Sequence, residues 1–227
     1  MFKNTPLLIV LSNLSTVLPF LSATAMLFFS RSIRNTILLW LFFTAALLTE
    51  ILVHAHHLAN KPNAWIIHLY TPLEYLLIVF ILSRWQNREK SRKAMLISIP
   101  LYLGLYGFMK IAGIENFESS TINYVSRPIS LLLIGGFVLF TLHQLSAREE
   151  TLLQSDYRFW ILLALAIYYC GSIIIVPFMY IQNREILLFL VYTHAILNIL
   201  QNLLFVIGNI CALGLVSPLA SGQDKTP

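Results

Sequence analysis

The chain has 227 residues, of which 58% are hydrophobic and 11% are charged, and its formal net charge is +5. A soluble domain carries about a quarter charged residues, because much of its surface stays in water. The composition therefore excludes a soluble globular protein, a disordered chain and a nucleic-acid-binding protein, and it predicts an all-α, polytopic membrane protein.

Seven apolar stretches are long enough for a spanning helix, which needs about 20 such residues. In chain order they run over residues 7–29, 35–58, 65–83, 94–113, 121–145, 159–181 and 185–216. Charged and turn-forming residues separate the stretches, and no segment between them is long enough for a soluble domain. We therefore expect residues 1–227 to form a single seven-helix transmembrane bundle.

Lys and Arg are unevenly divided between the two sides of this bundle. With the N-terminus outside, ten of the fifteen fall on the inner side and four on the outer side, while Arg127 lies within a helix. The positive-inside rule then predicts a cytoplasmic C-terminus, in a plasma membrane or a bacterial inner membrane. The basic segment Arg84–Lys93 should contact anionic headgroups of membrane lipids, with an acidic cytoplasmic partner protein as the alternative.

Ionisable groups at membrane depth are costly, so each one is a candidate functional residue. The depth of each group below the expected outer end of its helix follows from a rise of 1.5 Å per residue, and the deepest groups lie about 9 to 14 Å below that end. The inner half of the bundle holds far fewer polar groups. Eight polar residues from six helices thus form a candidate ligand site in the outer half: Asn13, Glu50, His54, Glu74, Arg127, Ser172, His194 and Asn198.

Helical periodicity places several of these residues on common faces. Two polar stripes have the spacing of one helix face, which predicts that they point into the bundle. The stripes are Glu50, His54 and His57 on the second helix, and His194, Asn198 and Gln201 on the last helix.

A purely structural interpretation of the polar layer is open at this point. It comprises interhelical hydrogen bonds, each contributing about 0.6 kcal/mol, and an ion pair of Arg127 with Glu50 or Glu74. His57 and His68 lie near the membrane interface and are expected to be solvated.

The leading functional interpretation is an outward-facing pocket in a sensor, receptor-like or binding protein. Arg127 would hold an anionic group of a small ligand by a bidentate contact, and His and Glu side chains would tune the charge.

A metal site is the main alternative, since zinc takes three or four nitrogen or oxygen ligands. A bound zinc ion would activate water for hydrolysis of a lipid amide or ester, although Arg127 at the same depth disfavours a dication there. A small-solute transporter is a third option, and haem held by two histidines is a fourth. The residues that could bind zinc are Glu50, His54, Glu74 and His194.

The expected layout resembles that of G-protein-coupled receptors and microbial rhodopsins, but the last helix has no lysine for a retinal Schiff base. Seven-helix zinc hydrolases such as alkaline ceramidases and adiponectin receptors carry Ser-x-x-x-His on helix two and paired histidines on helix seven. Here Glu50 stands four residues before His54, and Asn198 stands four residues after His194. The hydrolase pattern therefore fails at both places, and the sequence assigns no family.

Overall fold

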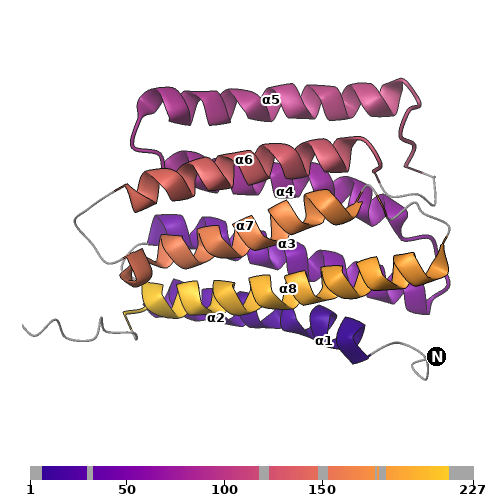
Figure 1. Cartoon of the computed structure of the whole chain (residues 1–227), viewed down its shortest axis with the longest axis horizontal. Helices are drawn as coiled ribbons and strands as arrows, with labels where there is room; N and C mark the ends of the chain where they lie inside the picture. Colours follow the sequence, from indigo (N-terminus) through magenta and orange to yellow (C-terminus); the bar gives the residue numbers. More distant parts are fainter. Residues whose placement is uncertain are drawn as a thin grey trace, which may run out of the picture.

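The computed structural model describes residues 7–29, 33–117, 123–147, 153–176, 178 and 183–214. Within these ranges all regular structure is helical, with no strand, and the long helices pack side by side as one bundle (Figure 1). In chain order the elements are α1 (Leu7–Ser15), α2 (Val17–Phe29), α3 (Ile33–Leu58), α4 (Ala64–Arg84), α5 (Glu89–Ile111), α6 (Ser126–Ser146), the short 3₁₀ turn η2 (Leu153–Ser155), α7 (Tyr157–Ile175) and α8 (Arg184–Ala212).

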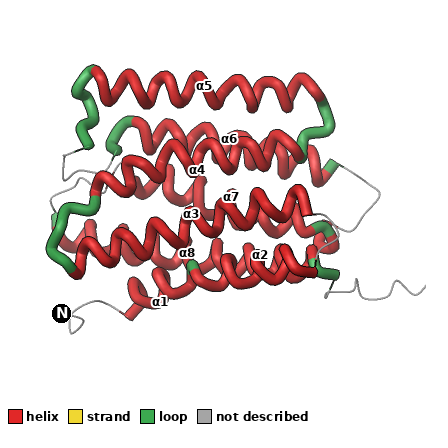
Figure 2. Tube along the Cα trace, turned by 180° about the vertical axis from the view of Figure 1, so that it is seen from behind, coloured by secondary structure: helices red, strands yellow, loops and turns green. Residues whose placement is uncertain are grey.

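Seven spans among the described residues are long and apolar enough to cross a membrane, with α1 and α2 counting as one span over Leu7–Phe29. The predicted all-helical, seven-span architecture is confirmed to this extent, and it indicates a multi-pass membrane protein. The break between α1 and α2 falls at Thr16 (Figure 2). It follows from Pro19, which has no backbone N–H to donate to the carbonyl of Ser15 four residues earlier.

Three helix boundaries differ from the sequence-based expectation by five residues or more. The fourth span begins at Glu89 instead of residue 94, so the helix extends into the polar segment, where an acidic residue in the first turn favours the helix N-terminus. The fifth span begins at Ser126 instead of residue 121. The sixth ends at Ile175 instead of residue 181, two residues before Pro177, since a proline has no backbone N–H to donate to the carbonyl four residues earlier. The last span ends at Ala212 instead of residue 216, with Gly214 in the left-handed conformation just beyond it, and residues 215 and 216 lie outside the described residues.

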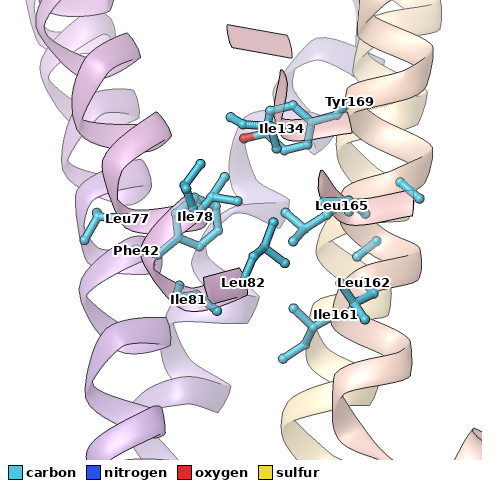
Figure 3. Packing of buried hydrophobic residues seen from close by; sticks show 14 of the residues in the cluster. Phe42, Leu77, Ile78, Ile81, Leu82, Ile134, Ile161, Leu162, Leu165 and Tyr169 are labelled. Atoms are coloured by element: carbon cyan, nitrogen blue, oxygen red, sulfur yellow. The ribbon is translucent and has the colours of Figure 1, made fainter. Parts of the chain in front are cut away.

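The apolar core lies around α4, which contacts α3, α5 and α6. Leu82 of α4 is fully buried, with Leu165 of α7 across from it, and Ile134 of α6 lies beside Tyr169 in the same cluster (Figure 3). In the most apolar window of α4, 61% of the residues are buried, against 17% for α5, which lies at one edge of the bundle (Figure 1). The core therefore fixes α4 as the central helix, against which the polar groups of α6 and α7 are placed.

A row of asparagines attaches α8 to the first span. Each asparagine amide donates a hydrogen bond to a serine hydroxyl of α1 or α2, and the serines follow one another at intervals of one turn or more. Polar pairs therefore replace apolar contacts along this seam. The pairs are Asn198 with Ser12 at 3.0 Å, Asn202 with Ser15 at 2.8 Å, and Asn209 with Ser22 at 2.8 Å.

The start of α6 is set back from the end of the bundle (Figure 1). The hydroxyl of Tyr102 donates to the carbonyl of Ser126 at 3.2 Å, and Tyr102 lies nine residues before the end of α5 at Ile111. At 1.5 Å per residue, α6 therefore begins about 14 Å below the end of α5. This placement puts Arg127, in the first turn of α6, at the depth of the middle of α4.

Non-helical backbone at that depth needs hydrogen-bond partners from the protein. Glu115 supplies them, because its Oε1 accepts from the backbone N–H groups of Val125 at 2.6 Å and Ser126 at 2.8 Å. Its Oε2 accepts from the Ser126 hydroxyl at 2.6 Å. The Glu115 carboxylate thus stabilises the N-terminus of α6.

Candidate functional site

A cavity of about 450 Å³ lies between the helices, within the volume range of small-molecule sites. It is surrounded by α2, α3, α4, α6, α7 and α8, and it lies in the half of the bundle nearest the turn between α3 and α4. We call it the central cavity. Six of the eight sequence-predicted site residues line it: Glu50, Glu74, Arg127, Ser172, His194 and Asn198.

One wall of the central cavity holds a buried ion pair between Arg127 and Glu74. The two side chains are only 12% and 3% exposed. The second carboxylate oxygen of Glu74 accepts a hydrogen bond from the hydroxyl of Tyr169 at 2.7 Å. Of the two partners considered for Arg127, the structure selects Glu74, and the positive charge of Arg127 is therefore compensated within the protein.

Glu50 is the remaining acidic residue of the central cavity. It is half-buried on α3, and its carboxylate has no hydrogen bond or ion pair to any side chain in the described part of the chain. Because Arg127 and Glu74 neutralise each other, an ionised Glu50 would leave the cavity with a net negative charge.

Two further polar groups of the cavity wall are buried without a hydrogen-bond partner among the described residues. They are the hydroxyl of Ser172 and the Nδ1 atom of His194. Ser172 is 1% exposed, and the His194 ring lies 5.4 Å from the ring of Tyr168. Buried polar groups are nearly always paired, so unpaired groups beside a cavity are available to a bound molecule.

The other predicted residues are placed differently. The Asn198 amide, although on the cavity wall, is engaged with Ser12 of α1. Asn13 and His54 do not line the central cavity. They line a second, more open hollow of about 700 Å³ between α1 and α3, which we call the α1–α3 groove and which also touches Glu50.

Sequence reasoning did not select the tyrosines of this site. Tyr168 and Tyr169 are neighbours in the apolar run of α7, so periodicity could not tell which of them faces the cavity. The structure places Tyr168 on the cavity wall and Tyr169 against Glu74. Tyr70 also lines the cavity, one turn before Glu74 on α4; this spacing is a signal that was available in the sequence.

A second polar cluster lies nearer the end of the bundle, around Lys110 of α5. Its ammonium group lies 2.6 Å from His68 Nδ1, donates to Asn123 at 3.1 Å, and pairs with Glu115 at 3.6 Å. His68 is only 1% exposed, so the prediction that it is solvated was wrong, whereas the side chain of His57 is exposed as expected. The cluster links α4 and α5 to the start of α6.

The charge of Glu115 is stabilised within this cluster. Burial alone would raise the pKa of its carboxyl, but hydrogen bonds from the Ser126 hydroxyl and from two backbone N–H groups, together with the ammonium of Lys110, lower the pKa below its ordinary value. These groups therefore favour the ionised carboxylate that stabilises the start of α6.

The described residues contain no group of three His, Cys, Asp or Glu side chains placed to hold a metal ion. Of the predicted zinc ligands, His54 lies in the groove, while Glu74 is engaged with Arg127. The zinc site remains a prediction that this arrangement does not support.

The basic segment Arg84–Lys93 forms the end of α4 and the start of α5. The side chains of Arg88, Lys90 and Arg92 are exposed there, at the end of the bundle opposite the turn between α3 and α4. They are accessible to headgroups or to a partner.

No family model, curated protein or solved structure matches this chain. The functional argument therefore rests on the geometry of the central cavity.

Proposed function

We propose that this chain is a membrane-embedded binding protein of the sensor or receptor kind, which takes a small ligand into the central cavity. The observation that carries the proposal is a pair of buried groups without a hydrogen-bond partner among the described residues, the Ser172 hydroxyl and His194 Nδ1, on the wall of a cavity of about 450 Å³. A ligand with matching donors and acceptors would satisfy both groups.

The energetic argument rests on the cost of such groups. A buried donor or acceptor without a partner costs about 1–3 kcal/mol, and a folded chain gains nothing from keeping two of them beside a cavity unless something binds there. The ion pair of Arg127 and Glu74, which Tyr169 joins by a hydrogen bond, holds another part of the cavity wall in a fixed arrangement. Such preorganisation lowers the cost of ordering the site on binding.

The proposal includes an orientation. With the N-terminus outside, as the distribution of Lys and Arg favours, the central cavity lies in the outer half of the bundle. The same orientation brings the basic segment Arg84–Lys93 to the cytoplasmic headgroups.

Thiol labelling tests whether small molecules reach the cavity. Ser172→Cys is made in a chain whose own Cys170 and Cys211 are replaced by alanine, and its reaction with methyl methanethiosulfonate is timed. Ser130→Cys serves as the matched control, because Ser130 is equally buried but does not line the cavity, and its hydroxyl is hydrogen-bonded to a backbone carbonyl.

We expect Ser172→Cys to react at least about tenfold faster than Ser130→Cys, since thiol reactivity follows access. Equal, slow rates would show that the cavity is closed to solutes and would overturn the proposal. Metal analysis tests the hydrolase alternative. One equivalent of bound zinc in the purified protein, lost in His194→Ala, would indicate a metalloenzyme and contradict the proposal of a metal-free binding protein.

A further inference from the structure

The central cavity and the α1–α3 groove share one wall. Three residues line both hollows: Thr16 at the break between α1 and α2, and Glu50 and Val53 on α3. The Glu50 carboxylate, which has no partner in the described part of the chain, thus lies where the polar interior and the groove meet. A molecule that binds Glu50 can occupy both spaces at once.

The charge at this wall favours a cation. Arg127, the basic residue on the cavity wall, is engaged by Glu74, so it offers little to an anionic ligand. An ammonium group has only donors, and it matches a carboxylate that lacks a partner within the described chain. The aromatic rings of Tyr70 and Tyr168 line the same cavity and can face a cation.

The groove favours an apolar chain. On α3 it extends from Leu47 to Leu58, about 16 Å at 1.5 Å per residue. Its edges carry apolar side chains that are exposed on the outside of the bundle, including Leu14 at 60% and Ile51 at 53%. In a membrane these side chains face lipid, so the groove opens toward the bilayer, and its histidines, His54 and His57, lie beyond Glu50 toward the end of α3.

We infer that the ligand of the proposed binding function is a protonated long-chain amine. Its ammonium group reaches the central cavity, where it binds the Glu50 carboxylate, and its alkyl chain lies in the α1–α3 groove, through which it enters from the bilayer. This inference rests on the proposed function and names the class of ligand that the site takes.

Protection of the Ser172→Cys thiol tests the inference with defined probes. The variant is placed in phosphatidylcholine nanodiscs, and its reaction with methyl methanethiosulfonate is timed with increasing dodecylamine or 1-dodecanol. The two probes have the same chain and differ in the charged headgroup. Leu139→Cys, half-exposed on α6 and away from both hollows, reports any general effect of the probes on the reaction.

We expect dodecylamine to slow labelling of Ser172→Cys at concentrations at least about tenfold lower than dodecanol, the size expected from a charge-assisted hydrogen bond. Glu50→Gln should remove this difference, while Glu89→Gln, at the opposite end of the bundle, should leave it unchanged. The thiol introduced by Ser172→Cys should react at the same rate with and without Glu50→Gln when neither probe is present. This equality shows that the Glu50→Gln variant still forms the cavity.

The outcomes separate the two proposals. Equal protection by both probes, or a preference for the amine that persists in Glu50→Gln, overturns the amine inference and leaves the binding function standing. A Ser172→Cys thiol that does not react at all overturns both.

Discussion

The buried ion pair of Arg127 and Glu74 gives the sharpest stability prediction. Changing Arg127 to methionine leaves the Glu74 carboxylate, 3% exposed, with the Tyr169 hydroxyl as its remaining partner. Changing Glu74 to glutamine leaves a buried guanidinium without a counter-charge. Breaking a buried pair by removing one partner costs about 3–5 kcal/mol, because an uncompensated charge stays in a medium of low polarity.

The double variant should behave differently. With both charges removed, the side-chain amide oxygen introduced by Glu74→Gln can still accept from the Tyr169 hydroxyl, and no buried charge is left unpaired. Replacing a buried pair by neutral groups is often close to neutral in stability. We therefore expect the double variant Glu74→Gln/Arg127→Met to be more stable than either single variant.

Unfolding in sodium dodecyl sulfate from lipid bicelles, followed by circular dichroism, measures these free energies. Lys93→Ala is the control, because the Lys93–Glu89 pair is 69% and 76% exposed and should change stability by less than about 0.5 kcal/mol. The pairing would be refuted if the free-energy losses of the two single variants added up in the double variant. It would also be refuted if each single variant were as stable as the Lys93→Ala control.

Three further predictions use the same unfolding assay. The pKa of Glu115 is lowered in the folded protein, so its carboxylate stabilises the fold above the ordinary pKa of 4.5, and this stabilisation is lost as the pH falls through the folded pKa. Glu115→Gln should remove this acid sensitivity, and an unchanged pH profile would contradict the role of Glu115. Gly208→Ala would place a methyl group 2.9 Å from an α7 side chain and should cost about 1–3 kcal/mol, whereas Gly136→Ala meets open space and should cost nothing; equal effects would refute the close approach. Asn202→Leu should lose about 0.6 kcal/mol with its bond to Ser15, and no loss would show that the seam is held by packing alone.

Much of the fold could be predicted because apolar runs of membrane length are a strong signal in sequence. The runs at residues 35–58 and 65–83 differ from α3 and α4 by no more than two residues at either end. The polar stripes were also informative, since the spacing of Glu50 and Glu74 within their helices predicts inward faces. The common depth of these groups follows from helical rise alone.

The start of α6 could not be predicted from sequence, because its cause is tertiary. Glu115 is a polar residue between two apolar runs, which is the usual composition of a surface loop, and Asn123 falls within the expected helix over residues 121–145. Both are instead part of the connection before α6 and are buried against Lys110 of α5. Only the packed bundle shows that this connection enters it, and so that Arg127 reaches Glu74.

The division of roles among charged residues was also hidden. Sequence reasoning assigned Arg127 to the ligand, because an intramembrane arginine is a natural partner for an anion. The structure pairs it with Glu74 and leaves Glu50 without a partner in the described chain, which reverses the charge of the expected ligand. No periodicity distinguishes these two glutamates, since both face the same interior.

Equilibrium binding of isotopically labelled dodecylamine to the protein in nanodiscs tests the central claim most directly. A ligand held at Glu50 predicts one saturable site per chain in the wild-type protein, above the partitioning into empty nanodiscs, and loss of that site in Glu50→Gln. Binding that never saturates, or that is the same in both proteins, would contradict the claim.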